Sequence, residues 1–92
     1  MNVEPRIPLS PALGAYLGLR RAVRGHLAYD DGLRRFVDGG RLTPSYLDEP
    51  LRILVTQGFL RLAPGGHSHP VEITPTGRDR YRQLCQDRQQ RT

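Results

Sequence analysis

The sequence contains no lysine, and arginine supplies all of its 14 basic side chains. Against nine acidic residues this gives a formal net charge of +5 and an isoelectric point of about 10.3. A balance this basic favours polyanionic partners such as nucleic acid. Arginine also carries a planar fork of donors that fits phosphates and guanine edges, whereas lysine is a point charge. Genomic base composition is an alternative source of the arginine bias.

Cysteine is almost absent as well. Cys85 is the only one, which excludes an intrachain disulfide framework and suits a reducing compartment. The first ten residues lack the basic start and apolar stretch of a signal peptide, and no apolar run approaches the length that spans a membrane. We therefore expect a soluble, cytoplasmic, nucleoid-associated protein with no membrane contact.

The length of 92 residues fits one small domain with a modest core and leaves little room for a deep catalytic cleft. We expect a flexible arm at residues 1–9, the domain at 10–89 and a frayed tail at 90–92. A domain of this size is only marginally stable by itself, so oligomerisation is a reasonable expectation.

Three pairs of a hydroxyl residue and proline predict helix starts, because a capping hydroxyl is followed by proline at the first helical position. The pairs are Ser10-Pro11, Thr43-Pro44 and Thr74-Pro75. Apolar residues at helical spacing then predict a first helix over 11–28 and a last helix over 75–89.

Between the first two of these starts we expect a short second helix. Asp30 or Asp31 would cap it, and Gly39-Gly40 would end it by adopting the left-handed closing conformation. Its inward-facing residues would be Leu33, Phe36 and Val37.

The third helix, opening at Thr43, contains Pro50, which would remove a hydrogen bond and clash with the preceding turn. We expect one kinked helix. The alternative is a separate turn over residues 43–48, with the regular helix beginning near Glu49. At 3.6 residues per turn, its buried side would consist of Leu47, Leu51 and Leu54.

Alternating apolar and polar residues predict short strands at 59–63 and 70–74, joined by the polar loop "PGGHSH". The predicted fold is therefore α+β and mainly helical. It has three N-terminal helices, a β-hairpin and a C-terminal helix.

Several motifs in this order form a known combination: "LTPS" at 42–45, Leu51, Leu54 and Gly58 in the third helix, and "ITPTGR" at 73–78. Together, over roughly residues 30–85, they resemble the winged helix-turn-helix regulators of the MarR and PadR type. The resemblance implies that the third helix reads DNA and that the hairpin is the wing. Pro50 and the acidic pair Asp48-Glu49 depart from the family pattern.

A reading helix of this kind would present its outer face and N-terminal half to base edges in the major groove. The residues expected to do so are Thr43, Ser45, Tyr46, Glu49 and Arg52. Contacts with the DNA backbone and from the wing are expected from Arg41, Arg61, His67, His69 and Arg78. The alternative is an ordinary solvated helix face and a turn with exposed imidazoles.

Two helix faces are candidates for a twofold dimer interface. Gly14 and Gly18 form a flat strip on the first helix, and Tyr81, Leu84 and Cys85 form an apolar face on the last. The alternative is that both faces close the core of a single chain.

Enzyme motifs are missing from the sequence. There is no glycine-rich phosphate loop and no His-Glu-x-x-His motif, and Ser68 has no orienting acid beside its histidine neighbours. His67 and His69 have only the distant His26 and one thiol as possible co-ligands, so we expect no metal site and no cofactor.

The combined expectation is a small dimeric protein that binds specific sequences of double-stranded DNA and represses transcription by blocking polymerase. Two alternatives stay open. One is a winged-helix module that binds a protein partner, and the other is a sequence-independent architectural or partition protein.

Overall fold

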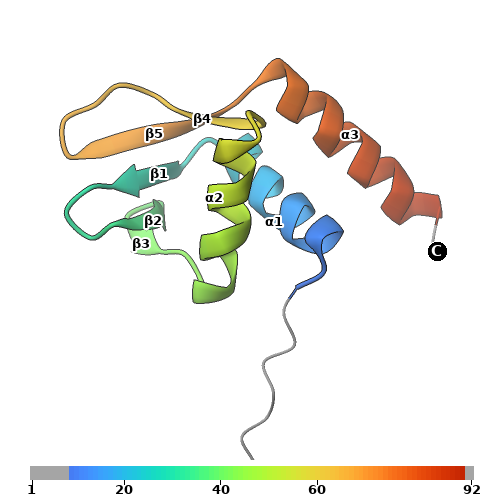
Figure 1. Cartoon of the computed structure of the whole chain (residues 1–92), viewed down its shortest axis with the longest axis horizontal. Coiled ribbons are helices and arrows are strands. Elements are labelled where there is room, and N and C mark those ends of the chain that lie inside the picture. Colours follow the sequence, from blue (N-terminus) through green and yellow to red (C-terminus); the bar gives the residue numbers. More distant parts are fainter. Residues whose placement is uncertain (1–8, 91–92) are drawn as a thin grey trace, which may run out of the picture.

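The computed structural model describes residues 9–90 and has an α+β fold (Figure 1). Residues 1–8 and 91–92, which hold most of the predicted arm and tail, lie outside the described residues. The helices are α1 (Pro11–Arg24), α2 (Asp48–Thr56) and α3 (Pro75–Gln90), and a short 3-10 helix, η1 (Ser45–Leu47), precedes α2. The strands are β1 (Leu27–Asp30), β2 (Arg35–Asp38), β3 (Arg41–Leu42), β4 (Leu60–Leu62) and β5 (Ser68–Ile73).

The five strands form one antiparallel sheet in the order β3-β2-β1-β5-β4. Its two hairpins meet where β1 pairs with β5, with Ala28 opposite Pro70 and Tyr29 opposite His69. The predicted strands at 59–63 and 70–74 are confirmed as the β4–β5 hairpin, although β5 begins two residues earlier than predicted. The β1–β5 pairing joins segments about 40 residues apart in the chain into one surface.

The predicted second helix is wrong, because the segment is the β1–β2 hairpin. Asp30 pairs with Arg35 across a four-residue loop, and the Asp30 carboxylate accepts a hydrogen bond of 2.9 Å from the Leu33 amide. Strand conformation lets the backbone of β1 bond to neighbours on both sides, which a short isolated helix cannot do. No helix therefore lies between α1 and η1 in the described chain, and the winged helix-turn-helix order is not confirmed.

Helix α1 starts at the predicted cap, where the Ser10 hydroxyl accepts a hydrogen bond from the Leu13 amide at 3.1 Å. It ends four residues earlier than predicted. Gly25 adopts a left-handed conformation with φ of 85°, and its amide bonds to the Ala22 carbonyl. Glycine has no Cβ to oppose this conformation, so it terminates the helix and releases residues 27–30 to the sheet.

Pro50 does not kink a longer helix. A 3-10 turn comes first, and α2 begins at Asp48, so the alternative of a separate turn describes this region better. Pro50 is the third residue of α2, where an amide has no partner within the helix and its absence costs little. Its ring also faces Gly14 of α1, where a Cβ would lie 3.0 Å from the Pro50 Cγ.

The core lies between α1, α2 and the sheet. Its fully buried side chains are Leu19, Leu47, Leu51, Leu54 and Leu60. Gly18 of α1 permits close packing with α2, because a Cβ there would come within 2.7 Å of the Leu54 side chain. Helix α2 therefore packs against the glycine strip of α1.

The Thr74-Pro75 start of α3 is confirmed. The Thr74 hydroxyl accepts a hydrogen bond from the Gly77 amide at 3.0 Å and lies 2.7 Å from the Gly58 carbonyl. A Cβ at Gly77 would overlap the Phe59 carbonyl oxygen. The "TPTG" motif thus caps α3, and its glycine lets the first turn of α3 pack directly against the backbone of Phe59, just before β4.

Candidate nucleic-acid interface

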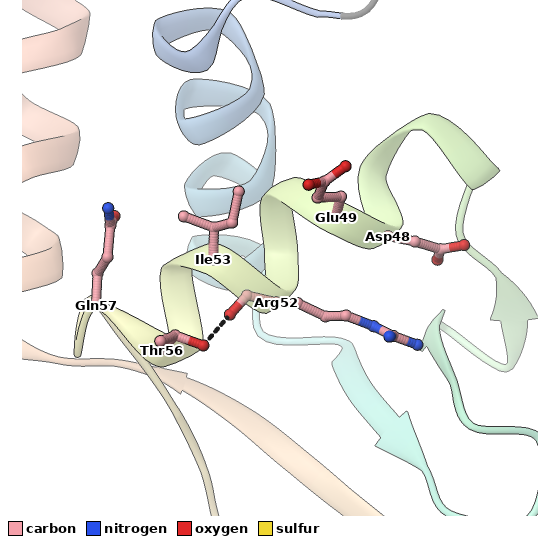
Figure 2. Close-up of a pocket in the computed structure, with 6 residues that line it drawn as sticks. All are labelled: Asp48, Glu49, Arg52, Ile53, Thr56 and Gln57. Atoms are coloured by element: carbon pink, nitrogen blue, oxygen red, sulfur yellow. Dashed lines mark hydrogen bonds between the residues drawn. The ribbon is translucent and has the colours of Figure 1, made fainter.

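Helix α2 has one buried and one exposed side, as the helical wheel predicts. Leu47, Leu51 and Leu54 are each at most 1% exposed, whereas the side chains on the opposite side are open to solvent. The exposed residues of η1, α2 and the residue after α2 are Ser45, Tyr46, Glu49, Arg52, Ile53, Thr56 and Gln57. Figure 2 shows that Arg52 extends toward the β1–β2 hairpin, while Glu49 and Ile53 project in a different direction. The exposed side is therefore divided into two flanks.

The flank beside the hairpin is basic, and we call Arg34, Arg35 and Arg52 the basic flank. The Arg52 guanidinium lies 3.5 Å from the Arg34 carbonyl oxygen, which brings a side chain of α2 to the turn of the hairpin. Neither Arg34 nor Arg52 forms an ion pair with a carboxylate of the described chain. Their charges are thus free to meet an external anion.

Arg35 has a structural role within this flank. Its guanidinium donates to the Asp48 carboxylate at 3.2 Å and to the Thr43 carbonyl at 3.1 Å. It therefore neutralises one of the two carboxylates in the first turn of α2 and fixes the hairpin to the start of that helix. An acidic first turn also complements the positive end of the helix dipole.

Arg34 has an unusual backbone for a residue with a side chain. Its φ is 53°, and it is the only non-glycine residue with positive φ in the described part of the chain. The left-handed conformation costs roughly 1–2 kcal/mol for an L-residue, so glycine or asparagine usually occupies it. A strained arginine at a hairpin turn is a reason to look for a functional contact at that place.

The other flank of α2 is apolar and acidic, and we call Tyr46, Glu49 and Ile53 the groove flank. Tyr46 and Ile53 are 57% and 46% exposed. They line a groove of about 1160 Å³ between α1, α2 and α3. The groove also contains Leu9, Pro50, Phe59 and, on α3, Arg80.

Thr43 is not a reading residue. It is buried with 2% exposure, and its hydroxyl donates to the Phe36 carbonyl at 3.2 Å. It is not a helix cap either, since η1 begins after Pro44 without a side-chain cap. The hydroxyl satisfies a buried carbonyl of β2, so a role for Thr43 in contacting DNA is excluded by its position.

The predicted wing residues divide into three kinds. Arg61 of β4 is exposed but forms an ion pair of 2.6 Å with Glu72 of β5. His67 is exposed in the loop. His69 does not lie at the tip: it is part of β5, and its ring is held by Asp31 at 2.7 Å. Only His67 is both at the tip and free of an ion pair in the described chain.

The two predicted backbone-contacting arginines lie at opposite ends of the α2 region. Arg41 is exposed on β3, where it pairs with Asp38 at the end of β2 that is distant from Arg35 and the β1–β2 turn. Arg78 is exposed on the first turn of α3, which starts beside Gly58 beyond the end of α2. Neither residue lies beside the β1–β2 turn, so both stay predicted contacts with the DNA backbone.

The predicted dimer residues are engaged within one chain. Gly14 and Gly18 face α2, and Leu84 is buried in the core. Tyr81 stacks on Tyr16 of α1 with ring centroids 5.8 Å apart. Burial, with a hydrogen bond to Cys85, raises the pKa of the Tyr81 hydroxyl above its ordinary value of 10.0.

These contacts support the alternative to the predicted interface, in which both helix faces close the core of a single chain, and homodimerisation itself stays a prediction. Arg88 adds to the same packing, since its guanidinium lies 4.4 Å from the centre of the Tyr16 ring. The sequence shows both faces as small or apolar, but it does not show that α1 itself is their partner.

Within residues 9–90, no cluster of His, Cys, Asp or Glu side chains is placed to hold a metal ion, and no helix could cross a membrane. No family model matches the sequence, and neither a curated protein nor a solved structure is significantly similar to it.

The structure also brings together residues that the sequence analysis did not connect. Arg34 and Arg35 are next to Arg52 only because residues 27–38 form a hairpin instead of a helix. The contact between Asp31 and His69 was likewise not predicted. The Asp31-Gly32 pair, a common hairpin-turn signal, could have indicated both.

Proposed function

We propose that the protein binds duplex DNA through the exposed side of α2 and the turn of the β1–β2 hairpin. The observation that carries this proposal is the 3.5 Å contact between the Arg52 guanidinium and the backbone carbonyl of Arg34, which makes two exposed arginines neighbours although they are 18 residues apart in the chain. Both guanidinium groups lack a carboxylate partner in the described chain. Paired arginines beside an exposed helix suit contacts with successive phosphates or with a guanine edge.

The order from α2 onward supports the same proposal. A helix with a free outer side is followed by the β4–β5 hairpin and by a helix that begins with "TPTGR". In this arrangement Ser45 and Arg52 would meet base edges, and Arg41 and His67 would contact the sugar-phosphate backbone. The β1–β2 hairpin would take the place that a preceding helix occupies in a helix-turn-helix. A protein bound near a promoter in this way would repress transcription by excluding polymerase.

The test is a comparison of two double variants by fluorescence anisotropy with a labelled duplex. Arg34→Gln with Arg52→Gln removes two charges from the proposed interface. Arg24→Gln with Arg82→Gln removes two exposed charges from α1 and α3. We expect the first variant to lose at least about tenfold in affinity and to flatten the salt dependence, because fewer counterions are released. The second should lose much less.

Equal losses in the two variants would reject the proposed interface, because they would mean that only total charge matters. Absence of binding by the wild-type protein at low salt would reject DNA as the partner. A set of genomic and random fragments at near-physiological salt then separates the modes of binding. Tight binding to a few fragments indicates a regulator, and uniform binding indicates a sequence-independent architectural protein.

A second candidate function, binding of a protein partner, is favoured by the groove flank. Tyr46 and Ile53 are large, exposed and next to a groove that also contains Phe59 and Pro50. Exposed apolar side chains around a concave surface are typical of interaction sites. Among residues 9–90 no basic side chain forms an ion pair with Glu49, so a partner with an apolar segment and a basic side chain would fit. A wild-type protein that binds no DNA fragment would favour this alternative.

A further inference from the structure

The ring of His69 lies between two oxygen atoms that both accept hydrogen bonds. Nε2 is 2.7 Å from the Asp31 carboxylate, and Nδ1 is 3.2 Å from the Ala63 carbonyl. The side chain is 22% exposed, so water has limited access to the ring. Each ring nitrogen therefore depends on its protein partner.

A neutral imidazole has one N–H and one lone pair, so it can donate to only one of these oxygens. In that state the other nitrogen would direct a lone pair at an oxygen. The imidazolium has two N–H groups and donates to both. The hydrogen bond with Asp31, then that with Ala63, raises the pKa of His69 above its ordinary value of 6.5, although burial opposes the shift.

These contacts connect the two hairpins at their ends. Asp31 belongs to the β1–β2 loop, and Ala63 follows β4 at the start of the β4–β5 loop. A backbone bond runs beside them, from the Asp31 amide to the His67 carbonyl at 2.8 Å. The ring is therefore the side-chain connection between loops that the β1–β5 pairing brings together.

Few other charged groups surround the ring. Tyr29 is its cross-strand neighbour on β1, and the Asp30 carboxylate is bonded to the Leu33 amide. His67 is exposed in the adjoining loop. Asp31 is the one carboxylate in contact with His69 in the described chain, so the protonation of His69 also decides whether the charge of Asp31 is neutralised.

We propose that His69 is a proton-dependent clasp that fixes the β4–β5 loop to the β1–β2 turn. When the ring is protonated, both hydrogen bonds form and the two loops are held together. When it loses its proton, one contact is lost, Asp31 carries an unneutralised charge, and the loops separate more often. The clasp is independent of whether the protein binds DNA.

The direction of the effect follows from the raised pKa. The stabilisation is fully present below the ordinary histidine pKa of 6.5 and is lost as the pH rises through the higher value of the folded protein. The affected range therefore lies above pH 6.5.

NMR titration of the wild-type protein tests the clasp directly. The His69 ring should titrate above 6.5, and the protection of the Asp31 amide against hydrogen exchange, corrected for intrinsic rates, should fall over the same range. Asp31→Asn should lower the pKa of His69. His69→Gln should give weaker protection that no longer changes with pH, and His67→Gln should leave the pH dependence of the Asp31 protection as it is in wild type.

Three results would overturn the proposal. The first is titration of His69 at or below 6.5 in the folded protein. The second is Asp31 protection that stays constant while His69 titrates. The third is the same pH dependence in His69→Gln as in wild type. If His69→Gln fails to fold, the wild-type titration and Asp31→Asn still decide the matter.

Discussion

The two flanks of α2 share one nine-residue helix but have opposite character. The basic flank is completed by the β1–β2 hairpin, which brings Arg34 and Arg35 to Arg52. The groove flank is completed by α1 and α3, which leave Tyr46 and Ile53 beside an open groove. A polyanion fits the first and an apolar segment fits the second. The comparison shows that the neighbours of a helix decide what its exposed side can bind.

The largest effect is expected from a substitution on the buried side of α2, which holds the helix in place beneath both flanks. Leu54→Ala should lower the free energy of unfolding by about 2–5 kcal/mol, because it removes a buried side chain and leaves a cavity. Leu54 is 1% exposed and packs against Gly18. Urea denaturation measures the change. A loss below about 1 kcal/mol would mean that α2 is not fixed by this packing.

The second-largest effect should be a difference in DNA affinity between substitutions on the basic flank and on the groove flank. Arg52→Ala should weaken duplex binding by about tenfold, since a contacting arginine contributes about 1–3 kcal/mol. Ile53→Ala, its neighbour on the groove flank, should leave binding unchanged. Anisotropy titrations of both variants make the comparison, with circular dichroism as a check on folding. An equal loss in Ile53→Ala would indicate that DNA also covers the groove flank.

A smaller effect concerns the strained turn of the basic flank. Arg34→Gly should raise the free energy of unfolding by up to about 1 kcal/mol, because glycine adopts positive φ without a steric penalty. The same variant should bind duplex DNA more weakly. Arg34→Lys keeps both the charge and the strain, so its stability should match wild type. If Arg34→Gly lowers stability, the strain argument is wrong.

The smallest effect is expected at the β4–β5 hairpin. Glu72→Gln breaks the exposed ion pair with Arg61, whose side chains are 47% and 67% exposed. Stability should change by less than about 0.5 kcal/mol, as is usual for surface pairs. Duplex affinity should rise slightly, because Arg61 is no longer neutralised. No rise would place Arg61 outside the DNA contact, in contrast to the basic flank.

The sequence predicted the local features correctly where short-range chemistry decides them. The caps at Ser10 and Thr74 and the β4–β5 hairpin lie where the sequence placed them. The leucine side of α2 is buried as its spacing indicated. Each of these depends on a few neighbouring residues, so a linear pattern is enough to predict it.

The errors occurred where partners distant in the chain decide the outcome. Leu33, Phe36 and Val37 fit a short helix, but Phe36 and Val37 lie in β2, which pairs with β1 on one side and with β3 on the other, and Leu33 lies in the hairpin loop. Gly14 and Gly18 fit a dimer interface in the sequence, but α2 of the same chain packs against them. Thr43 looked like a cap but bonds to Phe36 of β2.

The sequence by itself determined the basic charge, the amphipathic α2 and the capped starts of α1 and α3 at Ser10 and Thr74, because these are properties of single residues and their near neighbours. Tertiary structure alone decided that residues 27–38 form a hairpin and that Arg34 meets Arg52. It also decided that His69 meets Asp31. The pairing of β1 with β2 forms the hairpin, and its pairing with the distant β5 brings Asp31 and His69 together, because backbone groups that are buried without partners are costly.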